Sequence, residues 1–195
     1  MTNQLTRTRI LEAVLFASDT PVEMERLSEI IDGLTPSEIM DLIDSLNREY
    51  ETEGRSFRLV EVAGGFQFET LPQFGSFIEK LYRSKSRPKL SRASLETLAI
   101  VAYKQPISKV EIDALRGVDS DAAIRTLLNR DLIEITGRSE AVGRPIIYGT
   151  TQEFLRYFGL KDIKDLPGAD ELASMFDGSE VRESPPEQLR LDEHI

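Results

Sequence analysis

The sequence of 195 residues contains no cysteine and a single histidine. Without cysteine the chain forms no disulfide bond and has no thiol nucleophile, which fits a reducing compartment. His194 stands next to the C-terminus, where no partner groups are held around it, so it is not expected to bind a metal or act as a catalytic base. Glycine-rich phosphate loops and Cys/His clusters are also missing. The sequence therefore predicts no enzyme, no cofactor and no metal site.

Long apolar runs are absent as well. No segment approaches the roughly 20 apolar residues that a membrane helix needs, and the opening residues Met1–Arg7 contain no apolar stretch typical of a signal peptide. We therefore expect a cytoplasmic protein that has no contact with membranes.

Basic side chains are scarce. The chain has 24 Lys and Arg against 34 Asp and Glu, a formal net charge of −10. Residues 1–86 hold 9 basic and 15 acidic side chains, and residues 168–195 hold 2 and 8, whereas residues 87–150 hold 10 and 8. Because phosphate affinity comes from Lys and Arg, only residues 87–150 are suited to attract a nucleic acid.

The stretch from Pro88 to Thr151 carries signals for three helices followed by a hairpin. The helix boundary signals are an N-cap at Ser91, a proline stop at Pro106, a capping box formed by Ser108 and Glu111, a glycine stop at Gly117, and a cap at Asp119 or Ser120. The apolar period then changes to two, which predicts strands around Ile133 and around residues 146–148, with residues 137–143 as the loop. Helix, helix, helix and hairpin is the order of a winged helix.

An internal repeat appears at an offset of 85 residues. The matched positions include Pro21 and Pro106, Val22 and Ile107, Leu27 and Ile112, Ile39 and Ile124, Leu42 and Leu127, and, in the first helix, Ile10 and Leu95. The first 70 residues are therefore expected to form another winged helix, whose hairpin turns at Gly64 and Gly65.

We predict a mainly α fold with small β wings, of the α+β class, built from two tandem winged-helix domains. The N-terminal domain is placed at residues 1–82, a linker at 83–90 and the C-terminal domain at 91–166. A helix at residues 152–158, capped by Thr151 and stopped by Gly159, closes the second domain. Residues 167–195 are acidic, with few large apolar groups, and are expected to be a disordered tail.

The two first helices carry more apolar surface than one core needs. From Leu98 onwards the helix that ends at Tyr103 is apolar on every side, and in the helix ending at Ala17 the side chains of Leu11 and Leu15 lie off the stripe formed by Ile10, Val14 and Ala17. Either a neighbouring domain, the helix at 152–158 or a partner chain must cover these faces.

Winged helices often bind DNA through the third helix. In the first domain that helix carries Glu38, Asp41, Asp44 and Glu49, which repel phosphates. In the second domain, acidic Asp119 and Asp121 stand at the start of the third helix, but Arg125, Asn129 and Arg144 are basic or polar groups that a DNA-binding transcription regulator would use. That regulator is the alternative to a protein-binding function.

Five segments together resemble the bacterial segregation and condensation protein B family. They are ILEAVLFA at 10–17, LSRASLETLAIVAYKQPI at 90–107, RGVDS at 116–120, LLNRDLI at 127–133 and GRPIIYGTT at 143–151. The resemblance covers residues 7–167. It implies a non-enzymatic, nucleoid-associated subunit that dimerises through its N-terminal domain and binds the kleisin subunit, segregation and condensation protein A. That kleisin bridges the heads of the SMC ATPase in a complex that condenses and segregates chromosomes, and DNA contact would be indirect or weak.

The resemblance also suggests where the partners bind. Kleisin contacts carried over to this sequence are Tyr103, Lys104, Gln105, Pro106, Ile107, Arg144, Pro145, Ile147 and Tyr148. Candidates for the dimer interface are Leu11, Leu15, Phe66 and Phe68. Each of these residues also has an ordinary structural explanation, because Pro106 and Ile107 form a helix-helix turn and Ile147 alternates into a core.

Overall fold

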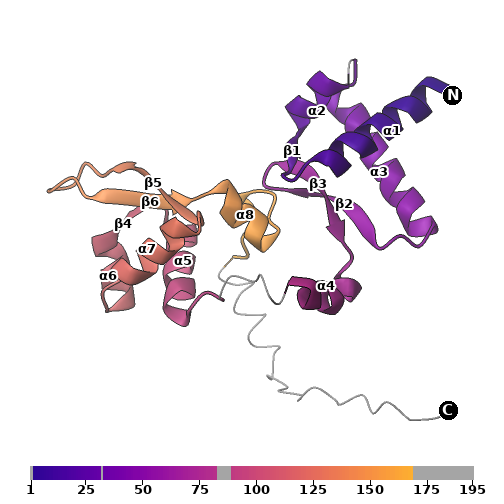
Figure 1. The fold of residues 1–195 in the computed structure, drawn as a ribbon. Coiled ribbons are helices and arrows are strands. Elements are labelled where there is room, and N and C mark those ends of the chain that lie inside the picture. The colour runs from indigo at the N-terminus through magenta and orange to yellow at the C-terminus, as the bar shows by residue number, and fades with distance from the viewer. Residues whose placement is uncertain (1, 32, 83–88, 169–195) are drawn as a thin grey trace, which may run out of the picture. The chain divides into compact units, whose positions relative to one another are not determined.

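A computed structural model describes residues 2–31, 33–82 and 89–168 of the chain. Residues 83–88 of the predicted linker, residues 169–195 of the predicted tail and His194 lie outside the described residues. The elements fall into two series with the same order, helix, short strand, two helices and two strands, which confirms two tandem winged helices of the α+β class (Figure 1). The domain limits chosen from the sequence stay predictions.

The first series begins with helix α1. Its elements are α1 (Thr2–Ala17), β1 (Val22–Glu23), α2 (Met24–Ile30), α3 (Pro36–Thr52), β2 (Phe57–Val62) and β3 (Gly65–Thr70), followed by the 3-10 turn η1 (Pro72–Phe74) and α4 (Gly75–Tyr82). The three strands form an antiparallel sheet in the order β1-β3-β2. The two-residue strand β1 was not predicted, because pairing over more than 40 residues leaves no local signal.

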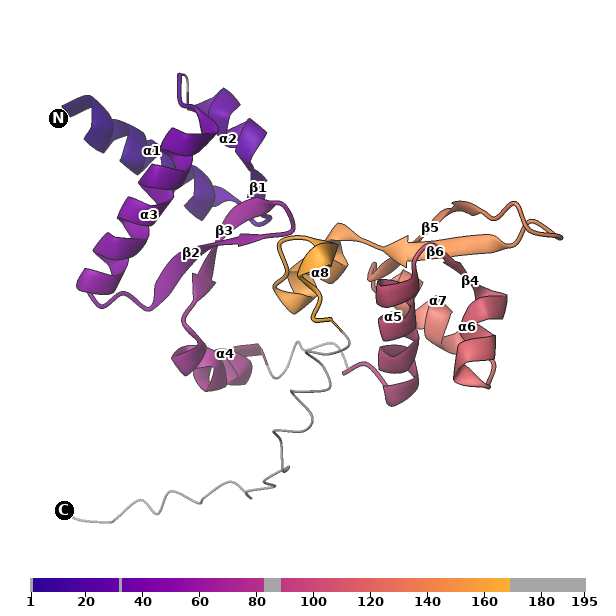
Figure 2. The ribbon, with the colours of Figure 1, turned by 180° about the vertical axis from the view of Figure 1, so that it is seen from behind.

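The second series repeats this plan. Its elements are α5 (Arg92–Lys104), β4 (Ile107–Ser108), α6 (Lys109–Arg116), α7 (Asp121–Asn129), β5 (Ile133–Arg138) and β6 (Ile146–Thr150), followed by α8 (Gln152–Phe158) and η2 (Ile163–Asp165). The sheet order is β4-β6-β5 (Figure 2). The side chains of Ser91, Ser108 and Thr151 accept the predicted capping hydrogen bonds, and Gly117 and Gly159 adopt the left-handed conformation that ends α6 and α8.

The repeat holds from the first short strand onwards. Leu27 and Ile112 are both fully buried, and the buried pairs Ile39 with Ile124 and Leu42 with Leu127 keep the offset of 85. In the first helices, however, the buried Leu11 and Leu15 correspond by burial to Thr97 and Val101, an offset of 86. One residue turns a helix by about 100°, so the predicted inward stripe of α1 was wrong.

That shift changes which side chains of α1 reach the surface. Leu11 and Leu15 belong to the core with Leu27, Ile39 and Leu46, whereas Ile10 is 41% exposed and Phe16 is 81% exposed. Helix α5 likewise buries one face and leaves Leu95 45% exposed. From Leu98 onwards, Leu98, Val101 and Ala102 are buried, and the prediction that another domain or a partner chain covers the remaining faces stays a prediction.

The first hairpin turns one residue earlier than predicted. Val62 pairs with Gly65, so the loop residues are Ala63 and Gly64, with φ angles of 50° and 73°. Both positive values are typical of a primed two-residue turn. Gly65 serves another purpose, because a Cβ there would lie 2.9 Å from the carbonyl carbon and oxygen of Val22. Glycine lets β1 approach β3.

Candidate partner-binding surface

Gln105 links the end of helix α5 to the end of strand β6. Its Oε1 accepts a hydrogen bond from the backbone N–H of Thr150 at 2.7 Å. Its Nε2 donates to the Thr150 hydroxyl at 3.0 Å and to the Ala102 carbonyl at 3.3 Å. A Cβ on Gly149 would lie 3.0 Å from Gln105 Oε1. The amide therefore acts as a clamp inside the second domain rather than as a free surface group.

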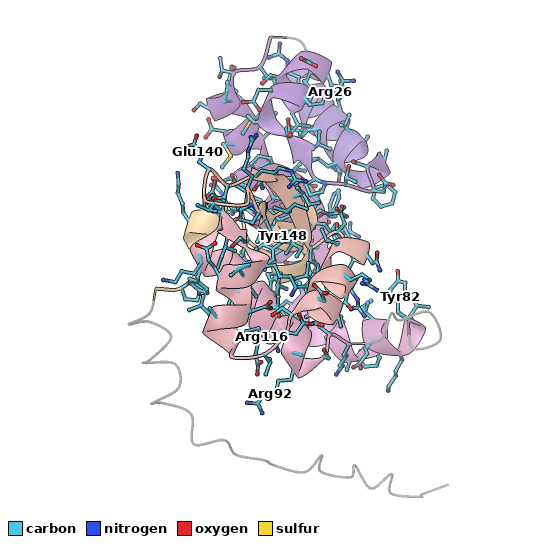
Figure 3. All side chains as sticks on the ribbon, turned by 90° about the vertical axis from the view of Figure 1, so that its left-hand side faces the viewer. Arg26, Tyr82, Arg92, Arg116, Glu140 and Tyr148 are labelled. Carbon is cyan, nitrogen blue, oxygen red and sulfur yellow. The ribbon has the colours of Figure 1, made fainter. Side chains whose placement is uncertain are left out.

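The strand pairing next to this clamp buries two more of the predicted contacts. Ile107 in β4 pairs with Tyr148 in β6, and both side chains are more than 90% buried (Figure 3 labels Tyr148). Ile147 and Pro145 are half-buried. Tyr103, Lys104, Pro106 and Arg144 are the predicted residues whose side chains are exposed. The nine residues thus divide into a supporting layer and an exposed layer.

A shallow groove lies beside the exposed layer. Its walls come from the end of α5, strands β5 and β6, the start of α8 and the segment that leads into η2. The lining residues are Ala102, Tyr103, Gln105, Glu134, Thr150, Thr151, Gln152, Leu155, Asp162 and Ile163, and the groove has a volume of about 520 Å³. Glu134 and Asp162 place two carboxylates in this lining beside apolar Ala102, Leu155 and Ile163, a combination that suits an extended peptide with apolar and basic side chains.

The loop between β5 and β6 holds the other exposed residue, Arg144. The backbone N–H of Arg144 donates to the carbonyl of Ala141, and the Arg138 guanidinium donates to the Arg144 carbonyl at 3.1 Å. Arg144 has a backbone φ of 44°, which is uncommon for a residue other than glycine. The loop is therefore an ordered turn that presents Arg144 and a fully exposed Val142.

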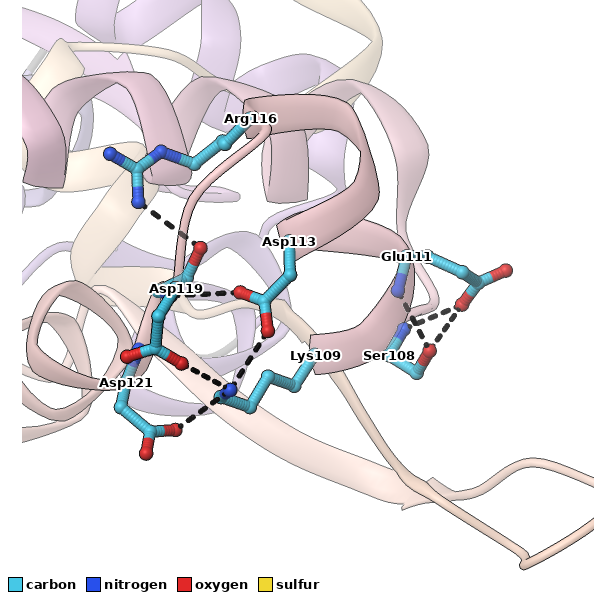
Figure 4. A network of polar contacts seen from close by, with 8 residues as sticks. Ser108, Lys109, Glu111, Asp113, Arg116, Asp119 and Asp121 are labelled. Carbon is cyan, nitrogen blue, oxygen red and sulfur yellow. Dashed lines mark hydrogen bonds and ion pairs between the residues drawn. The ribbon is translucent and has the colours of Figure 1, made fainter.

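A network around Lys109 joins α6 to the start of α7 (Figure 4). The ammonium group contacts Asp113 at 2.8 Å, Asp119 at 2.6 Å and Asp121 at 3.3 Å. Asp113 also accepts the backbone N–H of Ser120 at 2.8 Å. The hydrogen bond from Lys109 lowers the pKa of Asp113 and of Asp119, and the hydrogen bonds to these two carboxylates raise the pKa of Lys109.

This network decides the electrostatics of α7. Three carboxylates surround one ammonium group at the N-terminus of the helix, where a helix-turn-helix protein would meet phosphates and base edges. The remaining negative charge repels a phosphate backbone. Sequence reasoning noted Asp119 and Asp121 but missed Lys109. The spacing of Lys109 and Asp113, four residues apart on a helix, was the available signal.

In the first domain the predicted dimer residues lie mostly inside the chain. Leu11, Leu15 and Phe66 are 0%, 2% and 4% exposed, and Phe68 is half-buried. Phe68 contacts Phe57 with ring centroids 5.4 Å apart and Phe16 with centroids 6.1 Å apart. Of this aromatic row, Phe16 is the most exposed member, at 81%. The interface assignment itself stays a prediction.

The described residues hold no group of three or more His, Cys, Asp or Glu side chains that could bind a metal ion. Over the same ranges, no helix combines the length and the apolar character needed to span a bilayer. The carboxylates that do cluster, around Lys109, are ion-paired.

Comparison with known proteins connects these features to a family. The family model described as segregation and condensation complex subunit ScpB matches residues 9–169. Segregation and condensation protein B of Clostridium tetani is 45% identical over 89% of this chain and 92% of its own length. The protein of the same name from Symbiobacterium thermophilum is 51% identical over 81% of this chain and 71% of its own length.

Among solved structures, a dimer of the ScpB N-terminal domain complexed with an ScpA peptide is similar to this chain. The identity is 25%, the match covers 40% of this chain and 98% of the solved one, and the TM-score is 0.37. The family match and the curated relatives span nearly the whole described part of the sequence. The chain therefore belongs to the family of segregation and condensation complex subunit ScpB.

Proposed function

We propose that this chain is a non-enzymatic subunit of a bacterial SMC–kleisin complex and that it binds the kleisin subunit ScpA as a homodimer. The observation that carries the proposal is the family match over residues 9–169, with relatives of 45% and 51% identity. In this function the ATPase belongs to the SMC subunit, which the chain reaches through the kleisin. Its place in the cell would be the cytoplasm, at the nucleoid, where the complex condenses and segregates chromosomes.

The proposed kleisin-binding surface is the exposed layer of the second domain. Tyr103, Lys104 and Pro106 lie at the end of α5, beside the acidic groove, and Arg144 lies on the β5–β6 loop. The Gln105 side chain joins the backbone between Lys104 and Pro106 to the end of strand β6. Residues 91–166 would form the domain that carries this surface, and residues 1–82 would form the domain that dimerises.

The test is titration calorimetry of the full chain with purified ScpA of the same organism. The paired substitutions Tyr103→Ala and Arg144→Ala should weaken binding by about 2 kcal/mol, roughly 30-fold in Kd, if these side chains are central contacts. The matched control is Val110→Ala with Leu115→Ala. Those side chains are 70% and 59% exposed on α6 of the same domain, and their removal should leave binding unchanged.

Two results distinguish the proposed partner from the proposed contact surface. Wild-type protein that fails to bind ScpA would exclude the proposed function. Wild-type binding that the Tyr103 and Arg144 substitutions leave intact would move the contact to another surface while keeping the partner.

A further inference from the structure

Helix α4 has an apolar face that the described residues do not cover. Phe77, Leu81 and Tyr82 are 66%, 69% and 55% exposed, and no residue of the helix is buried (Figure 3 labels Tyr82). Phe74 and Ile78 lie on the same side by helical spacing and are half-buried, so the uncovered part of the face is formed by Phe77, Leu81 and Tyr82. Isolated helices this short are not stable in water, because the cost of the first turn exceeds the gain from a few hydrogen bonds. Helix α4 therefore needs a cover.

A second uncovered apolar site lies in the same domain. Phe16 on α1 is 81% exposed, and its ring meets the edge of Phe68 at an interplanar angle of 80°. Phe68 in turn contacts Phe57 and Tyr50. Tyr50 is 4% exposed and donates a hydrogen bond to Glu12 at 2.8 Å, which anchors the inner end of the row. Tyr50, Phe57, Phe68 and Phe16 thus form an aromatic platform, and its outermost ring, Phe16, is exposed.

We infer that these two sites cover each other between two copies of the chain: α4 of one protomer packs on the Phe16 and Phe68 platform of the second protomer, and the reverse contact forms by two-fold symmetry. The inference rests on the proposed homodimer and names the surfaces that would form it. Each protomer supplies one α4 face and one platform. In a two-fold dimer both sites of both protomers are therefore buried, and no exposed copy of either site remains.

The exposed area favours a second copy as the occupant. Phe16, Phe77, Leu81 and Tyr82 expose roughly 500 Å² of apolar surface per protomer, taking about 200 Å² for a full aromatic side chain. A standard interface buries about 800 Å² per partner, of which a little over half is apolar. The two sites together match that need. A single kleisin segment on either site would leave the other in water.

Charge substitutions at either site test the pairing. Because every contact is made twice, Phe16→Glu alone and Leu81→Glu alone should each raise the dimer dissociation constant at least 100-fold, measured by light scattering after gel filtration over a concentration series. Both side chains are largely exposed, so the fold should persist, which circular dichroism checks. The matched control Val110→Glu, on the exposed face of α6 in the second domain, should leave the dimer intact.

The absence of cysteine from the sequence allows a sharper test. Two differently tagged copies, one with Phe16→Cys and the other with Leu81→Cys, are co-expressed and oxidised with copper phenanthroline. A disulfide between the two tags is expected, and each variant expressed alone should give little covalent dimer.

The outcomes distinguish this inference from the homodimer on which it rests. A wild-type chain that is monomeric at every concentration overturns both. A dimer that survives both glutamate substitutions and forms no bond between positions 16 and 81 overturns the inference and leaves the homodimer standing. Efficient linking of Leu81→Cys to itself would show that α4 packs on α4 instead, which also overturns it.

Discussion

At the residue scale, Gln105 shows how one side chain can serve a surface without belonging to it. Its Oε1 accepts the backbone N–H of Thr150, and Gly149 leaves the space that the amide occupies. Sequence reasoning placed Gln105 with Tyr103 and Pro106 because the three are neighbours in the chain. Tertiary contact separates them, and no local pattern shows which of three adjacent polar or exposed positions will turn inwards.

Substituting Gln105→Leu should cost about 1–3 kcal/mol of unfolding free energy, because the Thr150 N–H would remain partly buried without an acceptor. Urea unfolding of the full chain measures the change. Lys104→Leu, at the exposed neighbouring position, is the control and should shift stability by less than about 0.5 kcal/mol. Equal losses of unfolding free energy in the two variants would contradict the role of Gln105 as a clamp between α5 and β6.

Gly65 offers a second test at this scale. In Gly65→Ala the new Cβ would meet the backbone of Val22 at 2.9 Å and that of Pro21 at 3.0 Å. Because backbone atoms cannot yield as a flexible side chain does, strand β1 must move away, and we expect a loss of about 1–3 kcal/mol. Gly75→Ala is the matched control. That position is open and begins helix α4, so alanine there should be neutral or slightly stabilising.

At the scale of elements, the Lys109 network ties α6 to α7 and makes the pair sensitive to acid. Lys109 lowers the pKa of Asp113 and Asp119 in the folded chain. A depressed folded pKa means that these carboxylates stabilise the protein above their unfolded pKa of about 3.9. Their contribution is lost as the pH falls through the lower folded values.

Lys109→Met should therefore flatten the loss of stability between about pH 4 and pH 2. The expected signature is a smaller drop of the urea midpoint over that range than in wild type. The carboxyl resonances of Asp113 and Asp119 should also titrate at higher pH than in wild type. Lys104→Met removes the same charge outside the network and serves as the control. Identical acid profiles of the two variants would show that the network does not set the pKa values.

Elements also show the limits of prediction from sequence. The caps at Ser91, Ser108 and Thr151 and the glycine stops were predictable because their chemistry is local. The rotation of α1 was not. Its apolar residues occupy several faces, and the face that turns inwards depends on α3 and the sheet. Strands β1 and β4 depend on partners more than 35 residues away.

A similar limit applies to the edge of the first sheet. Asn47 on α3 donates to the carbonyl of Leu59 at 3.0 Å and accepts its N–H at 2.8 Å. The amide thus replaces a neighbouring strand at this point of β2, which protects an edge that would otherwise pair with another chain. An asparagine within a helix pattern gives no hint of this role.

For the whole molecule, charge distinguishes the proposed kleisin-binding subunit from the alternative, a DNA-binding transcription regulator. The chain carries a formal net charge of −10, and its best candidate for a recognition helix begins among Asp113, Asp119 and Asp121 around one lysine. A DNA-binding regulator with several phosphate contacts loses affinity steeply as salt rises, because each contact releases a counterion. An apolar peptide contact responds weakly to salt, since few charges are paired across it.

We expect the isolated chain to bind a 30-base-pair duplex with a Kd above about 100 μM at 200 mM salt. This affinity is lower than that of typical non-specific DNA binding. Fluorescence anisotropy at 50 and 200 mM salt measures this. ScpA titrated under the same two conditions should lose far less affinity than a DNA-binding regulator loses for DNA, because the proposed surface combines Tyr103 and Pro106 with only two basic side chains, Lys104 and Arg144. Micromolar DNA binding that weakens steeply with salt, and that Arg125→Ala with Arg144→Ala abolishes, would instead favour the regulator. Arg130→Ala is the control for a general loss of positive charge.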